Sequence, residues 1–130
     1  QRRAHPGCVA CGADNPSGLH LRFARIDANA VEAVFSCADA YEGYRGRWHG
    51  GIIALVIDSA MTTCLFELGH TAVTAQLDLR FREPVRTRYP ATVRARRSRT
   101  AHHLHHLEAE VVQQGRVKVT ARGTFMDAAG

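Results

Sequence analysis

An aspartate stands in the middle of the most apolar segment of the chain, residues 50–68. Asp58 follows six aliphatic residues and lies too far into the segment to cap a helix. A carboxylate in such surroundings must be paired, hydrogen-bonded or pushed towards neutrality, and positions of this kind concentrate at functional sites. Thr62 follows one helical turn later on the same face. The pair indicates a catalytic carboxylate, with a structural bond from Asp58 to a backbone group or an arginine as the alternative.

The same apolar segment opens on His49, Gly50 and Gly51. The first turn of a helix leaves backbone N–H groups free and carries the positive end of the helix dipole, so it attracts negative charge. Glycines there let a ligand approach the backbone closely. A carbonyl oxygen that becomes an oxyanion needs such donors. An ordinary tight turn would also explain the three residues, but the buried acid that follows Gly50 makes the pattern more specific.

One helix and a set of strands must position these residues. Residues 50–68 predict a helix that ends at Gly69 and is apolar around nearly its whole circumference, as a buried helix is. Alternating apolar and polar residues predict strands at 19–23, 31–35, 74–82, 91–99, 103–113 and 116–126. The expected fold is α+β, with an antiparallel sheet of five or six strands wrapped around one long buried helix. We expect residues 1–18 to form an irregular lead-in and residues 19–130 to form one domain.

Composition narrows the class of protein. The chain has 130 residues, 45% of them hydrophobic, which excludes intrinsic disorder, and its net charge is +5. Sixteen of the 17 basic residues are arginines, spread along the chain without a nucleic-acid reading motif, so we expect no nucleic-acid partner. No uninterrupted apolar run approaches the roughly 20 residues of a membrane span, and the first residues lack the apolar stretch of a signal peptide. The expectation is a soluble, cytoplasmic protein with no membrane partner.

Cysteine and histidine raise the question of a metal. Cys8 and Cys11 form a CxxC pair that His5 and Cys37 could complete as a zinc site, whereas a tight turn with small buried thiols is the alternative. The histidine-rich segment 102–106 is interpreted as a solvated strand end, because ligands from a single strand do not converge on one ion. No metal is expected in the functional site.

Residues 49–58, HGGIIALVID, resemble the signature of the hotdog-fold acyl-CoA thioesterases of the phenylacetyl-CoA type. Similar segments include the lead-in at 8–23, the strand at 76–84 and the closing strands at 107–111 and 123–126, so the resemblance covers most of the chain. It implies the hotdog fold and hydrolysis of an acyl-CoA, or acyl-carrier, thioester. It also implies an active site at the interface of a homodimer, with a homotetramer as a further possibility.

The resemblance also implies roles for individual residues. The Gly50 amide would polarise the thioester carbonyl, and Asp58 of the facing subunit would act as nucleophile or as general base for water. Thr62 would position the water, and His49 would shape the entrance of the helix.

Substrate binding is expected of Gly51, Arg82, Arg97 and Arg99, with the arginines as candidates for the phosphates of coenzyme A. Coenzyme A is then part of the substrate, and no separate cofactor is expected. Relatives often carry Asn or Gln in the loop before His-Gly-Gly, where this chain reads Tyr41-Glu42-Gly43-Tyr44. The alternative is therefore a non-catalytic hotdog protein that binds acyl-CoA or fatty-acyl ligands.

Overall fold

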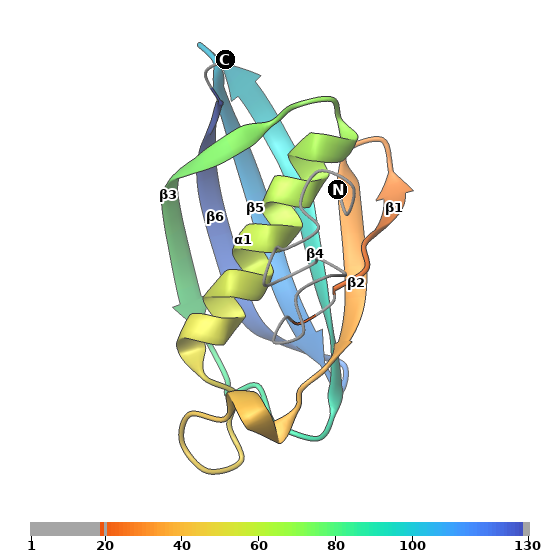
Figure 1. Ribbon diagram of the computed structural model, residues 1–130, viewed down its shortest axis with the longest axis vertical. Coiled ribbons are helices and arrows are strands. Elements are labelled where there is room, and N and C mark those ends of the chain that lie inside the picture. The colour runs from red at the N-terminus through yellow and green to blue at the C-terminus, as the bar shows by residue number, and fades with distance from the viewer. Residues whose placement is uncertain (1–18, 20, 129–130) are drawn as a thin grey trace.

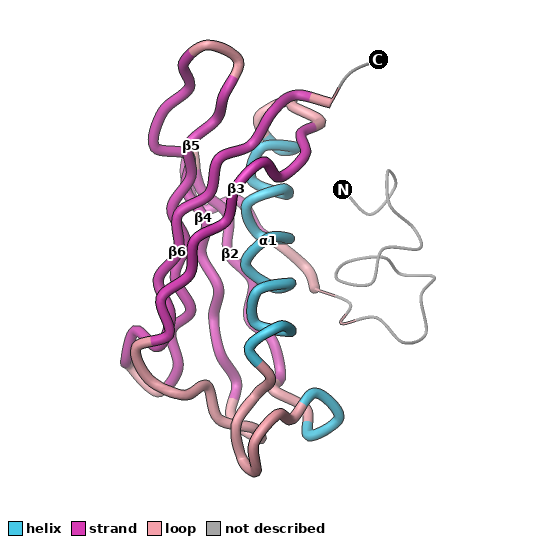
Figure 2. The backbone as a smooth tube through the Cα atoms, turned by 90° about the vertical axis from the view of Figure 1, so that its left-hand side faces the viewer, coloured by secondary structure: helices cyan, strands magenta, loops and turns pink. Residues whose placement is uncertain are grey.

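The computed structural model describes Leu19 and residues 21–128. In this part of the chain six strands form one antiparallel sheet, and one long helix lies against a single face of it (Figures 1 and 2). The helix is α1 (Gly50–Glu67), and the strands are β1 (Ala24–Asp27), β2 (Ala30–Ser36), β3 (Ala72–Phe81), β4 (Pro90–Ala101), β5 (Leu104–Gln113) and β6 (Arg116–Asp127). A short 3-10 helix, Asp39–Tyr41, precedes α1. The predicted α+β architecture is confirmed.

The strand order is β1-β2-β4-β5-β6-β3, so β1 and β3 are the two edges of the sheet. The chain leaves β2, runs through α1 across the face of the sheet, and enters β3 at the opposite edge. β4, β5 and β6 then fill the centre as consecutive antiparallel neighbours. This connection places the first half of α1 beside an edge strand with one unpaired side.

Both ends of α1 are fixed by local hydrogen bonds. His49 is the N-cap residue, and its Nδ1 accepts a hydrogen bond of 2.9 Å from the Gly51 N–H. At the other end Gly69 has a φ of +92°, and the His70 N–H donates to the Leu65 carbonyl at 2.9 Å. A left-handed residue after the last helical turn is a common helix ending, and glycine adopts this conformation without steric strain. The predicted end of the helix is confirmed.

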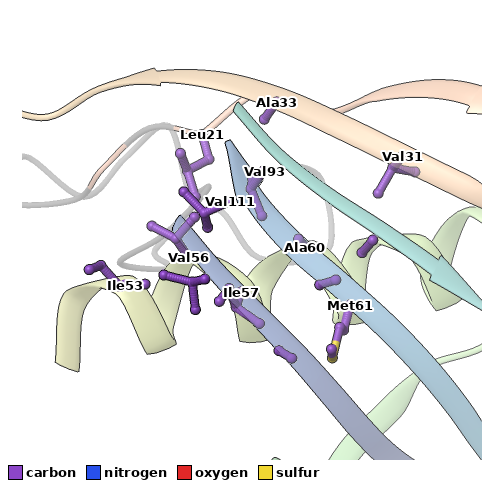
Figure 3. Packing of buried hydrophobic residues seen from close by; sticks show 14 of the residues in the cluster. Leu21, Val31, Ala33, Ile53, Val56, Ile57, Ala60, Met61, Val93 and Val111 are labelled. Carbon is purple, nitrogen blue, oxygen red and sulfur yellow. The ribbon is translucent and has the colours of Figure 1, made fainter. Parts of the chain in front are cut away.

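The core lies between α1 and the middle strands. Figure 3 shows Ile57, Ala60 and Met61 between the helix and the strands that carry Val93 and Val111, and all five residues are buried. By length and hydropathy α1 would also pass as a membrane span, with a mean hydropathy of 1.5 over its 18 residues. Half of that stretch is buried inside the fold, and packing on the sheet accounts for its apolar composition.

The expectation that α1 is buried all round is wrong for the described chain. A stripe of residues four apart, Gly50, Ala54, Asp58 and Thr62, is exposed at its first member and only half-buried at the other three. We call this row the α1 stripe. It runs beside the edge strand β3, where the sheet has no further strand to cover it.

Three strand predictions also need correction. Residues 19–23 were expected to form the first strand, but β1 begins at Ala24, and Leu21 instead packs into the core. Val117 was expected inside and Lys118 outside, whereas Val117 is 39% exposed and Lys118 only 6%, because a bulge in β6 at Lys118 shifts the register against β5. The histidine segment 102–106 does not form one strand end, because His102 and His103 make the turn between β4 and β5 with positive φ.

Candidate active site

The first turn of α1 presents one backbone donor without a partner. Gly51 donates to His49 Nδ1, and the His49 carbonyl accepts from the next two amides, at Ile52 and Ile53. The Gly50 N–H has no hydrogen-bond partner among the described residues, and Gly50 is exposed. The helix dipole adds to the positive potential at this amide. Of the two glycines predicted to meet the substrate, Gly50 therefore has a free donor and Gly51 does not.

Gly51 packs closely against the capping ring of His49. A Cβ on Gly51 would lie 3.1 Å from both Nδ1 and Cε1 of the His49 ring, closer than ordinary van der Waals contact. A Cβ on Gly50 would meet only the ring of Phe81, at 3.6 Å. Phe81, at the end of β3, thus covers the first turn of α1 from the side.

Asp58 lies further along the α1 stripe and is held by β3. The Thr74 hydroxyl donates to Asp58 Oδ1 at 2.5 Å, a bond from the beginning of β3 to the middle of the helix. Asp58 is half-buried, and its second carboxylate oxygen has no hydrogen-bond partner among the described residues. Thr62 follows on the same stripe and is also half-buried. Sequence reasoning selected Asp58 and Thr62 but missed Thr74, since its strand position says nothing about which helical residue it faces.

A cleft of about 810 Å³ opens at the first turn of α1. It is lined by the loop before the helix, the first turn and the segment after β3: Glu42, Gly43, Tyr44, Arg47, Trp48, His49, Gly50, Ile53, Phe81, Arg82, Glu83, Pro84 and Val85. The loop is anchored by Trp48, which is buried, stacks on Phe35 with ring centroids 5.2 Å apart and donates from Nε1 to the Ala38 carbonyl at 2.9 Å. The cleft combines apolar and charged side chains with the free Gly50 amide, a mixture typical of small-molecule binding sites.

The three predicted arginines separate in space. Arg82 lines the cleft and donates to the Thr120 hydroxyl at 3.2 Å. Arg97 instead bonds Asn29, at the turn between β1 and β2, and Arg99 lies beside His106 in the ladder of β4 and β5. Neither Arg97 nor Arg99 lines the cleft within one chain. Arg47, which the sequence did not single out, lines it together with Arg82.

Cys37 is a buried free thiol next to this region. Burial raises its pKa to about 12, and its sulfur accepts a hydrogen bond from Gln113 Nε2 at 3.7 Å. A thiol ligates zinc as the thiolate, so the raised pKa disfavours the role of fourth ligand considered for Cys37. His5, Cys8 and Cys11 lie outside the described residues, and the zinc site there stays a prediction.

The family model of the thioesterase superfamily matches residues 45–120, more than half of the chain. The chain therefore belongs to the thioesterase superfamily. No curated protein sequence matches it significantly.

Solved structures establish the fold. A crystallised thioesterase superfamily protein superposes with a TM-score of 0.89 at 22% identity over 94% of this chain, which spans 61% of that protein. The PaaI protein of Escherichia coli, from the phenylacetic acid degradation operon, gives 0.79 at 18% identity over 86% of this chain and 82% of its own. A hypothetical thioesterase from Streptococcus pneumoniae, crystallised with coenzyme A, gives 0.78 at 16% identity over 84% and 89%. The helix on a six-stranded antiparallel sheet is thus the hotdog fold predicted from the sequence.

Proposed function

We propose that this chain hydrolyses acyl-CoA thioesters to a free acid and coenzyme A, and that two chains form each active site. Membership of the thioesterase superfamily and the likeness to a thioesterase crystallised with coenzyme A support the reaction class. One observation carries the proposal. The α1 stripe begins at Gly50, whose backbone N–H has no hydrogen-bond partner among the described residues, and continues to Asp58, whose carboxylate is held by Thr74.

The chemistry follows from these two groups. The Gly50 N–H donates to the thioester oxygen and stabilises the negative charge that this oxygen gains when the carbonyl carbon is attacked. Asp58 either takes a proton from the attacking water or attacks the carbon itself, forming an anhydride that water then opens. The C–S bond breaks, the thiolate takes up a proton, and the acid leaves. Thr62 places the water, while Arg47 and Arg82 at the cleft meet the phosphates of coenzyme A.

A single chain cannot bring the two groups to the same thioester. Eight residues of helix separate Gly50 from Asp58, a rise of about 12 Å, far more than the span of one reacting carbonyl. Asp58 is accordingly not among the residues that line the cleft around Gly50. If Asp58 is the reacting carboxylate, the Asp58 that serves each Gly50 must therefore come from another copy of the chain.

The edge strand β3 supplies the surface for that second copy. One side of β3 is unpaired, and Val73 and Phe81 at its two ends are 53% and 54% exposed. Long exposed edges with apolar side chains favour pairing with another strand. Antiparallel pairing of β3 with its own copy sets the beginning of one strand against the end of the other. Because Thr74 holds Asp58 and Phe81 covers Gly50, such a pairing would bring Asp58 of one chain towards Gly50 of its partner.

The pneumococcal relative supports the choice of residues. Its structure was also determined for two variants, one with an aspartate and one with a threonine replaced by alanine, at positions 16 residues apart. Asp58 and Thr74 are separated by the same 16 residues in this chain. The residues selected for substitution in that protein thus have the spacing of the hydrogen-bonded pair described above.

The test is Asp58→Asn, assayed over short, long and aromatic acyl-CoAs, with Glu67→Gln on an exposed position of the same helix as the control. We expect Asp58→Asn to fold and elute as the wild type does on gel filtration but to lose about 10²- to 10⁴-fold in kcat, the usual contribution of general acid–base catalysis. Single turnover in H₂¹⁸O then tests the anhydride route. An acid that carries ¹⁶O from Asp58 shows that Asp58 is the nucleophile and that water opens the anhydride at the Asp58 carbon. An acid that carries ¹⁸O shows that water attacks the acyl carbon, as it does when Asp58 is the base. Retained turnover in Asp58→Asn would refute the role given to this carboxylate.

Binding without hydrolysis is the second candidate function, and Gly43 favours it. Gly43 borders the cleft against His49, where an added Cβ would lie 3.2 Å from the His49 Cα, and it contributes no amide side chain to hold water or substrate. Saturable binding of acyl-CoA by the wild type, with no release of free thiol for any substrate, would identify the chain as a binding protein.

A further inference from the structure

Two histidines and an aspartate meet at the end of the sheet remote from the cleft. His70 follows the glycine that ends α1, His105 lies on β5, and Asp127 closes β6. Figure 1 shows the end of α1, the beginning of β3 and the end of β6 at the same end of the molecule. The ladder pairs Ala72 with Asp127 and brings the segment after α1 beside the last residues of β6.

The three side chains converge on one point. His105 Nε2 lies 2.9 Å from Asp127 Oδ1, and His70 Nδ1 lies 3.3 Å from the same oxygen. The two imidazole rings are adjacent, with centroids 4.4 Å apart, and the three ligand atoms all lie within 4.8 Å of one another. Ligands of a tetrahedral zinc ion with bonds of about 2.0–2.1 Å lie about 3.3 Å apart, so an ion fits here after small side-chain shifts.

The geometry points to a binding site for a divalent transition-metal ion, with zinc as the best match, formed by His70, His105 and Asp127. Two imidazoles and one carboxylate are a donor set that zinc uses when a fourth position stays open to water or another ligand. The fourth position here faces solvent, because the side chains of His70 and Asp127 are 32% and 45% exposed. His105 is 1% exposed and fixes the inner side of the site.

Thr100 can orient the ring of His105 for metal binding. The Thr100 hydroxyl lies 2.9 Å from His105 Nδ1, on the side of the ring away from Asp127. A hydroxyl can donate or accept, so it can hold the ring with Nδ1–H as the donor and leave the Nε2 lone pair for a metal. Metal-bound histidines are commonly oriented in this way by a partner on the other ring nitrogen.

The site was hidden in the sequence because its ligands come from three elements. His105 belongs to the histidine segment 102–106, whose residues alone do not converge on an ion. The turn at His102 and His103 and the closure of β6 against β3 supply the convergence instead. Because the site ties the end of α1 to β5 and β6, metal binding would stabilise the folded chain.

The test compares His70→Gln with His106→Gln in the 130-residue chain without a purification tag. His106 neighbours His105 on β5 but is not in the cluster, so it is a matched control. Zinc binding is measured by calorimetry and by thermal melting. We expect wild type and His106→Gln to bind zinc and to melt roughly 10 °C higher at a zinc concentration 100-fold above Kd. We expect His70→Gln and Asp127→Asn to lose one bound ion or at least 30-fold in affinity, with little gain in melting temperature.

Two results would overturn the proposal. One is the same zinc stoichiometry, affinity and melting shift in His70→Gln and His106→Gln, which would place any bound zinc elsewhere, for example at Cys8 and Cys11. The other is wild-type chain that binds no zinc at micromolar concentrations. His70 is partly exposed, so its replacement does not disturb the core.

Discussion

Replacing Thr74 by valine removes one hydroxyl from β3 and preserves the branched shape that suits a strand. In the structure this hydroxyl donates to Asp58 Oδ1 at 2.5 Å. A hydrogen bond to a charged group contributes about 1.5–3 kcal/mol. Asp58 is only half-buried in the single chain, where water competes for the carboxylate, so the lower part of that range applies. At 1.36 kcal/mol per tenfold, we expect kcat to fall about 10- to 30-fold.

The assay follows release of free coenzyme A with a thiol reagent at saturating acyl-CoA. Thr74→Ser, which keeps the hydroxyl, is the matched control and should recover most of the rate. Thr74→Ser should melt close to the wild type, whereas Thr74→Val should melt several degrees lower, because the lost bond also stabilises the fold. A kcat for Thr74→Val within twofold of the wild type would refute the view that this bond positions Asp58 for the reaction. Equal losses in the valine and serine variants would refute it as well.

Three further predictions concern the surroundings of the site. Gly51→Ala should displace the His49 ring and remove the N-cap hydrogen bond, which lowers the free energy of unfolding by about 1 kcal/mol. Urea titration measures this loss, and unchanged stability would contradict the role of His49 as the cap. Gln113→Leu should lower the free energy of unfolding by about 3 kcal/mol or more, because the buried amide bonds three backbone groups of the loop between β3 and β4. A loss under about 1 kcal/mol in the same titration would mean that these hydrogen bonds do not hold the loop. Cys37 should resist alkylation by iodoacetamide in the native chain at pH 8, because a thiol with a pKa of about 12 is almost fully protonated at that pH. Rapid alkylation of the peptide that contains Cys37, detected by mass spectrometry, would disprove its burial.

Local sequence patterns predicted the fold well where the pattern and the structure depend on the same few residues. Gly69 ends α1 as expected, since a left-handed residue after an apolar helical run has few alternatives. Gln114 and Gly115 form the predicted hairpin turn between β5 and β6 with positive φ at both positions. The helix itself was predicted to within one residue of its observed end.

Predictions from the sequence pattern of one element failed where the position of a side chain depends on a neighbouring strand. The bulge that exposes Val117 and buries Lys118 arises from the pairing of β5 with β6, and alternation within β6 alone cannot reveal it. The same limit applies to the site. Asp58 is conspicuous in the sequence because it interrupts an aliphatic run, whereas Thr74 is an ordinary strand residue until the helix is packed beside it. Arg97 illustrates the converse, because its type suits a phosphate but its place in the sheet gives it Asn29 as a partner.

The distance between Gly50 and Asp58 along α1 predicts that two inactive variants can complement each other when they are mixed. If each site takes its amide from one chain and its carboxylate from the other, every chain contributes to two sites and completes neither. A chain with a defective Gly50 and a chain with a defective Asp58 are then each inactive alone. In a mixed dimer both defects fall in one site and the other site is intact. Random exchange makes half of the dimers mixed, so two inactive proteins together would regain about a quarter of the wild-type activity.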